Sequence, residues 1–313
     1  MGNLTAIIIF AAGLLLIIKG GDIFVDAARA IAETLGIPKF IIGATIVSFA
    51  TTLPELMVST LSASSGNLQL AIGNAIGSVT ANTGIIMSIS VIFMPAAVRR
   101  RVFLPKSMIL MSSVIVLWFL IMKGSLTVTN ALLLFAMLFV FLWENIQSAK
   151  KSSGIIKESR AETKLSKELL LFLAGAAAIV IGSRFLVNGG IKIAEIFNVP
   201  ENVIGFTMVA IGTSLPELVT TITAVAKKES SLSVGNIIGA NIIDTVLILP
   251  LCSIITGGSL PVTHENIVLD MPVCILEVAV MIIPMMFTGK FKKWQGCAAA
   301  TLYAVYIYLL AFK

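Results

Sequence analysis

The chain has 313 residues, of which 58% are hydrophobic and only 12% are charged. A soluble domain carries about 25% charged residues, so this chain lacks the polar surface of a soluble protein, and a soluble enzyme is excluded. The formal net charge of +6 fits the basic cytoplasmic loops of a membrane protein, so we expect a lipid bilayer around the chain and no nucleic-acid partner.

Ten apolar runs follow one another along the chain, and a helix needs about 17 to 25 such residues to cross a bilayer. The first five lie at Leu4–Ala28, Ile37–Ser62, Leu68–Ala97, Val102–Met122 and Leu126–Leu142. The second five lie at Leu169–Ile191, Val203–Ala226, Leu232–Thr256, Ile267–Phe287 and Trp294–Phe312. We therefore predict an all-α polytopic membrane protein of ten transmembrane helices, with two five-helix halves at residues 1–146 and 168–313 and a polar linker at residues 147–167.

Basic residues are concentrated on one side of this arrangement. The loops after spans 1, 3, 5, 7 and 9 contain 17 of the 22 lysines and arginines, whereas the opposite side has Lys123, Lys192, Lys313 and, near it, Arg184. Because basic loops stay in the cytoplasm, we expect the linker to be cytoplasmic and both termini to be extracellular in the cell membrane.

The two halves are copies of one another. Shifting the chain by 162 residues aligns Gly20–Asn82 with Gly182–Asp244 without a gap, and 20 of the 63 aligned positions are identical. The best-matched segments are TTLPEL (51–56) with TSLPEL (213–218), and GNAIG (73–77) with GNIIG (235–239). Each half has an odd number of predicted spans, so the second copy is inverted in the membrane. Inverted repeats are typical of secondary transporters, whose substrate site lies where the two copies meet.

Most of the 16 acidic residues lie in loops or near the ends of the apolar runs, and four lie farther inside them. Glu55, Glu217 and Asp244 lie deep within spans 2, 7 and 8, and no basic residue in spans 2, 3, 7 or 8 can pair with them. An ionised carboxylate in hydrocarbon needs a partner, and a bound cation is the natural one here. Glu277 in span 9 has no repeat mate, and we interpret it as a protonated acid that is hydrogen-bonded between helices.

A proline precedes each of the two glutamates. Pro54 and Pro216 lack an N–H group, which frees the carbonyls of Ala50 and Gly212 and disturbs both spans. Such breaks are tolerated in a membrane where they line a cavity or bind a ligand. Carboxylates, hydroxyls and free carbonyls together predict an all-oxygen cage, which suits Ca²⁺ and, with fewer oxygens, Na⁺.

Spans 3 and 8 add polar residues beside closely spaced glycines. Asn74, Ser78 and Asn82 share one helix face, and the second half has Asn236, Asn241 and Asp244. The glycine pairs Gly73/Gly77 and Gly235/Gly239 are expected to bring these spans against spans 2 and 7.

These paired segments resemble the two alpha repeats of the calcium/cation antiporter superfamily, with the closest similarity to the short prokaryotic sodium/calcium exchangers. The resemblance implies ten helices with four cation sites among spans 2, 3, 7 and 8, and a gating pair formed by spans 1 and 6. It implies Ca²⁺ ligands at Glu55, Glu217 and the carbonyls of Thr51 and Thr213. It implies Na⁺ ligands at the two glutamates, Thr52, Ser78, Ser214 and the carbonyls of Ser48 and Ala210, with Asn82 and Asp244 at the remaining polar positions.

The expected function is therefore antiport of Ca²⁺ against Na⁺ by alternating access, with Ca²⁺ extruded. A Ca²⁺/H⁺ antiporter is the alternative, although proton-coupled relatives carry acids where this chain has Gly77 and Gly239. A cation channel is a further alternative. The chain departs from the family pattern at Val79 and Ala240, where Asn and Ser are common. No cofactor is expected besides the transported ions, since the single histidine, His264, has no second imidazole with which to share a metal. We expect a monomer.

Overall fold

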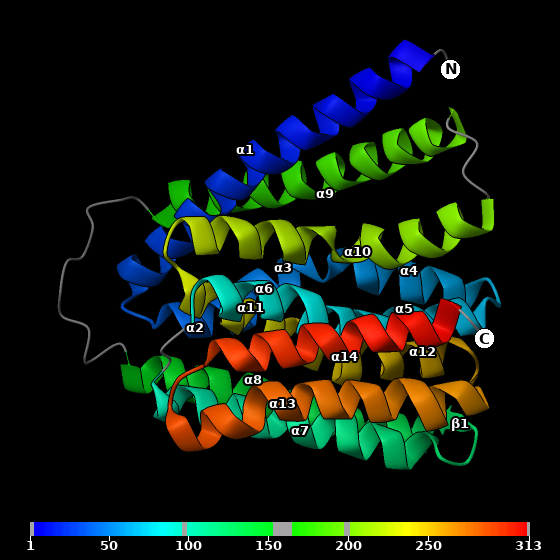
Figure 1. Ribbon diagram of the computed structural model, residues 1–313. Helices are drawn as coiled ribbons and strands as arrows, with labels where there is room; N and C mark the ends of the chain where they lie inside the picture. The colour runs from blue at the N-terminus through cyan, green and yellow to red at the C-terminus, as the bar shows by residue number, and fades with distance from the viewer. Residues whose placement is uncertain (1–2, 96–98, 153–164, 197–200, 312–313) are drawn as a thin grey trace.

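The computed structural model of the protein describes residues 3–95, 99–152, 165–196 and 201–311, and within the tenth helix the side chains are described from Gly212 onward. The chain forms a bundle of long helices (Figure 1). Before the linker these are α1 (Asn3–Leu35), α2 (Lys39–Ile42), α3 (Ser48–Thr51), α4 (Leu53–Ser64), α5 (Leu68–Ala81), α6 (Ser88–Phe93), α7 (Arg100–Ile121) and α8 (Val128–Ser152). After it they are α9 (Leu165–Ile196), α10 (Glu201–Ala226), α11 (Ser230–Ile243), α12 (Leu249–Ile255), α13 (Met271–Thr288) and α14 (Lys293–Ala311).

Seven helical stretches in the described ranges are long and apolar enough to cross a bilayer, as in a multi-pass membrane protein. They are Leu4–Leu35, Leu68–Phe93, Arg100–Ile121, Val128–Lys151, Leu165–Ile193, Ser230–Ile255 and Asn266–Thr288. The bent pair Lys39–Thr51 and Leu53–Ser64 is an eighth candidate. The predicted spans 7 and 10 correspond to α10 and α14, which are not among these seven, so the count of ten spans stays a prediction.

The most buried span passes through the centre of the bundle. In the stretch Ser230–Ile255, 83% of the most apolar window is buried, compared with 28% for α1 and for α9. Glycines allow this close packing: a Cβ atom on Gly235 would lie 2.3 Å from the carbonyl oxygen of Phe40, and one on Gly239 would lie 2.4 Å from Oγ of Ser48. The predicted packing role is therefore confirmed for Gly235 and Gly239. It was wrong for Gly73 and Gly77, because a Cβ atom on either would meet no described atom within 4 Å, so no described helix approaches α5 closely there.

The helices α1 and α9 lie side by side along the edge of the bundle (Figure 1). They run antiparallel and touch at glycines: a Cβ atom on Gly13 would lie 2.8 Å from the carbonyl of Gly182, and one on Gly189 would lie 2.7 Å from the backbone nitrogen of Phe10. The two predicted gating spans therefore pack against each other as a pair.

The two proline-containing spans differ. The first is divided at Thr52, and α3 and α4 form part of a pair bent by 44°. Pro54 then lies in the first turn of α4, where its missing N–H has no partner to lose. The second span was also expected to break, but α10 continues through Pro216, so that expectation was wrong. One lost hydrogen bond does not end a helix whose neighbouring bonds persist.

Four π-helical segments interrupt the spans and were not anticipated. They are η1 (Gly43–Val47), η2 (Asn82–Met87), η3 (Asp244–Ile248) and η4 (Asn266–Asp270). The segments η2 and η3 begin at repeat mates, Asn82 and Asp244. Single π-helical turns are frequent at functional sites.

The fold also contains one small pair of strands, so it is not wholly helical. The strands β1 (Ser125–Thr127) and β2 (Ser259–Pro261) pair antiparallel, with Leu126 opposite Leu260. They lie at the end of the bundle where both chain termini are found (Figure 1).

Candidate cation site

Two buried glutamates from opposite halves of the chain form the centre of the site. Glu55 lies in the first turn of α4 and Glu217 lies in α10, and both are fully buried. Ser214 Oγ donates to Glu55 Oε1 at 3.3 Å, and Thr52 Oγ1 donates to Glu217 Oε1 at 3.4 Å. Each glutamate is thus held by a hydroxyl of the other half, and the second oxygen of each has no partner among the described residues.

A second reciprocal pair of hydrogen bonds joins the two halves. Thr51 Oγ1 donates to Asn236 Oδ1 at 3.1 Å, and Thr213 Oγ1 donates to Asn74 Oδ1 at 3.2 Å. Because these threonine hydroxyls are occupied, they hold the halves together, and cation binding by the threonine carbonyls stays a prediction.

Asn74 and Asn236 were not among the predicted ligands, although their place on spans 3 and 8 was noticed. Asn74 Nδ2 also donates to the carbonyl of Glu55 at 3.2 Å and to Ser59 Oγ at 2.9 Å, so one amide connects α5, α4 and α10. The signal that could have revealed them is their identity as repeat mates.

Asp244 and Asn82 begin η3 and η2 and are almost completely buried. Among the described residues, neither carboxyl oxygen of Asp244 and neither amide atom of Asn82 has a hydrogen-bond partner. The charges of Glu55 and Glu217 interact with each other, and Asp244 interacts with both. In the described ranges no lysine or arginine forms an ion pair with these three acids, which leaves them free to hold cations.

The remaining predicted ligands are Ser48, Ser78 and Ala210. Ser48 is fully buried and donates its hydroxyl to the carbonyl of Thr45 at 3.0 Å, and Ser78 is buried one turn before Asn82. Ala210 lies in α10, in the part whose side chains are outside the described set. Within the described residues, no three His, Cys, Asp or Glu side chains converge on a metal position, so carbonyls, hydroxyls and amides must complete any cation shell.

Glu277 does not have the hydrogen bonds expected of it. It is fully buried, and both carboxyl oxygens lack partners among the described residues. Its carboxylate lies against the backbone of Gly84, where an added Cβ atom would be 2.6 Å from Oε1. Gly84 follows Asn82 by two residues in η2, so Glu277 contacts the π-helical segment at a different residue from the predicted ligand.

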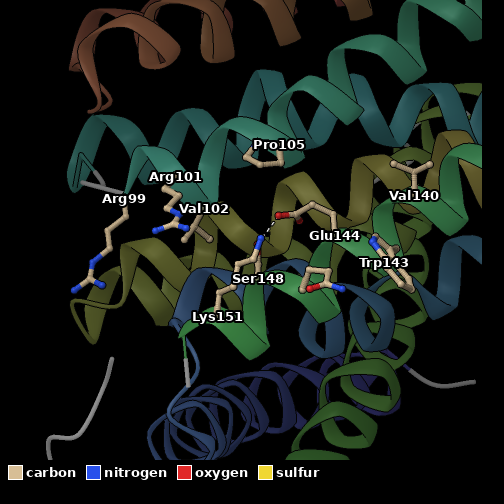
Figure 2. Close-up of a pocket in the computed structure, with 10 residues that line it drawn as sticks. Arg99, Arg101, Val102, Pro105, Val140, Trp143, Glu144, Ser148 and Lys151 are labelled. Atoms are coloured by element: carbon tan, nitrogen blue, oxygen red, sulfur yellow. Dashed lines mark hydrogen bonds between the residues drawn. The ribbon is translucent and has the colours of Figure 1, made fainter. Parts of the chain in front are cut away.

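Two cavities bear on the location of the site. A cavity of about 620 Å³ lies between α7 and α8, and Arg99, Arg101, Lys151 and Glu144 are among the residues that line it (Figure 2). None of its lining residues is a predicted ligand. A cavity of about 340 Å³ is lined by Pro54 and Thr213 of the central site and by residues of α9, so it reaches the site from the α9 side.

A cluster of buried carboxylates, hydroxyls and amides at the centre of a multi-pass helical bundle is the arrangement expected of a cation transporter. The sequence matches the sodium/calcium exchanger protein family over residues 5–147 and 167–312. The chain therefore belongs to this family of cation antiporters, whose members are transporters and not enzymes.

Relatives and solved structures agree with this family membership. The chain is 28% identical over 348 residues to the sodium/calcium exchanger MaX1 of Methanosarcina acetivorans, covering 97% of this chain and 98% of that protein. It is 33% identical over 266 residues to the inner membrane protein YrbG of Escherichia coli, covering 82% of each. The structure of the sodium-calcium exchanger NCX_Mj soaked with Na⁺ and Sr²⁺ superposes with a TM-score of 0.86 at 27% identity, covering 98% of this chain and 99% of that one.

Proposed function

We propose that the protein exchanges Ca²⁺ for Na⁺ across the cell membrane by alternating access, and that it normally exports Ca²⁺. The observation that supports this best is the reciprocal arrangement in which each buried glutamate is held by a hydroxyl from the other half. Two carboxylates balance one Ca²⁺, so Ca²⁺ and Na⁺ compete for Glu55 and Glu217, and that competition couples their movements.

The proposal includes ten transmembrane helices arranged as two inverted repeats, with the predicted residues as ligands. It is supported by the family match, which falls separately on each half of the chain, and by four hydrogen bonds that form two pairs of repeat mates. The basic loops favour a cytoplasmic linker and extracellular termini.

Purified protein in liposomes tests the proposal. An outward Na⁺ gradient should drive uptake of ⁴⁵Ca²⁺, whereas K⁺ or a pH gradient alone should not, because Gly77 and Gly239 occupy the positions where proton-coupled relatives carry acids. Uptake driven by pH without Na⁺ would instead establish a Ca²⁺/H⁺ antiporter, and Ca²⁺ flux without any counter-ion would indicate a channel.

Amide variants of the glutamates test the site. Glu55→Gln and Glu217→Gln keep the side-chain volume but remove one of two charges that balance Ca²⁺, so each should abolish transport in a folded protein. Glu277→Gln is the matched control and should transport well, because Glu277 is likewise fully buried but, unlike Glu55 and Glu217, accepts no hydrogen bond from a described residue of the other half. Transport near the wild-type rate in either glutamate variant would remove that residue from the site.

A further inference from the structure

The two approaches to the central site differ in charge and in packing. On the α9 side, the 340 Å³ cavity leads to Thr213, and Arg184 is the only charged residue among the described ones that line it. At the equivalent place on the α1 side the helices pack closely, because a Cβ atom on Gly21 would lie 2.8 Å from Oγ1 of Thr223 and 3.0 Å from Cγ1 of Val219. Gly21 is the repeat mate of Ser183, which lines the open cavity.

The charge difference between the two approaches can be compared position by position, because α1 and α9 are repeat mates. Asp22 and Asp26 of α1 are the mates of Arg184 and Asn188 of α9, so the same two positions are acidic on one route and cationic or neutral on the other. Asp22 and Asp26 lie 3.4 Å and 2.7 Å from Nζ of Lys227 but stay largely exposed. Arg184 is exposed and no described carboxylate forms an ion pair with it. Two routes built from copies of one sequence thus present opposite charge to a cation.

We propose that Arg184 lowers the affinity of the extracellular route for Ca²⁺, and that the opposed charges of Arg184 and Asp22/Asp26 favour Ca²⁺ export. This inference rests on the proposed function and orientation. A positive charge beside the path of an ion repels cations in proportion to their valence, and a negative charge concentrates them. Ca²⁺ that has been released outside therefore rebinds to the central site less readily, whereas Ca²⁺ from the cytoplasm binds more readily.

The valence dependence distinguishes this role from a structural one. A unit charge about 10 Å away across water changes the half-saturating concentration of a monovalent cation about twofold and that of a divalent cation about fourfold. Both effects must shrink as ionic strength rises, since salt screens the interaction. If Arg184 acted only through packing, the change for Ca²⁺ would not be the square of the change for Na⁺, and neither change would depend on salt.

Membrane vesicles of defined orientation provide the test. In right-side-out vesicles, Arg184→Gln should lower the half-saturating Ca²⁺ about fourfold and the half-saturating Na⁺ about twofold at low salt. Arg184→Lys should match the wild type, and Arg184→Glu should exceed the glutamine variant. In everted vesicles the glutamine variant should be unchanged. Lys123→Gln is the matched control, because it removes a basic residue from the same predicted side without lining the cavity.

Several outcomes would overturn the inference: no change in Arg184→Gln, equal changes for Na⁺ and Ca²⁺, an effect independent of salt, or an effect equally large in everted vesicles. If the wild-type protein shows no Na⁺-driven uptake, the proposed function fails instead. Equilibrium ⁴⁵Ca²⁺ binding to the detergent-purified wild type and Arg184→Gln then tests Arg184 separately, with the same fourfold difference expected.

Discussion

Glu229 connects three elements at the predicted cytoplasmic end of the bundle, and its removal should destabilise the protein measurably. It lies in the turn between α10 and α11, and its side chain is only 8% exposed. Lys39 Nζ at the start of α2 lies 2.7 Å from Glu229 Oε1, and Arg29 Nε of α1 lies 3.3 Å from the same atom. The carboxylate of Glu229 therefore connects α1 and α2 to the start of α11 by ion pairs.

The expected decrease in the free energy of unfolding lies between the values for an exposed ion pair and a buried one. Exposed ion pairs contribute about 0–1 kcal/mol, whereas removing one partner of a buried pair costs about 3–5 kcal/mol. Glu229 is buried, but the side chains of Lys39 and Arg29 are 27% and 50% exposed, so water solvates them once the partner is gone. We therefore expect Glu229→Gln to lower the free energy of unfolding by about 2 kcal/mol.

Thermal unfolding in detergent measures this loss. With an unfolding entropy of about 2.1 cal/mol/K per residue, that change corresponds to a fall in Tm of about 3 °C for a chain of 313 residues. Arg29→Gln is the control, because the half-exposed Arg29 should contribute less than about 1 kcal/mol. The reasoning is refuted if Glu229→Gln unfolds at the wild-type temperature, or if Arg29→Gln costs as much as Glu229→Gln.

Two further predictions concern the backbone. Gly235→Ala should destabilise the protein by about 1–3 kcal/mol, because its Cβ atom would lie 2.3 Å from the Phe40 carbonyl. The repeat mate Gly73→Ala should be well tolerated, since its Cβ atom meets no described atom within 4 Å. Lys228→Gly should raise the Tm, because Lys228 has a φ of 61°, a conformation that costs a residue with a side chain about 1–2 kcal/mol. Lys228→Ala is its control, and an equal gain in the alanine variant would contradict the backbone explanation.

The central site could be predicted because the repeat restricts it. Because Glu55 and Glu217 are repeat mates, we predicted that they meet where the two halves of the chain meet, and the structure links each to a hydroxyl of the other half. The close approach of α11 to span 2 likewise followed from Gly235 and Gly239, whereas the equivalent glycines of span 3, Gly73 and Gly77, meet no described atom within 4 Å. Both features depend on which residues stand at repeat-equivalent positions, so the residue types and the 162-residue offset were enough to predict them.

Other features depend on geometry that residue identity does not specify. Pro54 and Pro216 are equivalent in sequence, yet only the first lies at a helix boundary, because the backbone at Thr52 leaves the helical path before it. The π-helical segments at Asn82 and Asp244 have no composition signature, since one additional residue in a helical turn changes hydrogen bonding and not residue type. Glu277 was misjudged for a related reason: the missing side chain of Gly84, on another span, makes room for its carboxylate.

Asp244 is the position where the repeat breaks its chemical symmetry, and this break leads to a last prediction. Its mate is Asn82, so span 8 carries a carboxyl where span 3 carries an amide. Asp244 is fully buried, and its charge interacts with those of Glu55 and Glu217. Since two ionised glutamates already balance Ca²⁺, a third ionised acid would leave an uncompensated negative charge in a water-poor site, which is costly.

We therefore expect Asp244 to carry a proton at neutral pH and to act as a hydrogen-bonding neighbour of the bound cations. Asp244→Asn keeps the shape of the side chain and removes only its ability to ionise, so it should retain substantial Na⁺-driven ⁴⁵Ca²⁺ uptake in liposomes. Asn82→Asp is the informative counterpart, because it adds an acid at the mate position and should be tolerated if that acid also stays neutral. If Asp244→Asn loses transport as completely as Glu217→Gln, then Asp244 is ionised and binds the cation directly, and the site holds three negative charges instead of two.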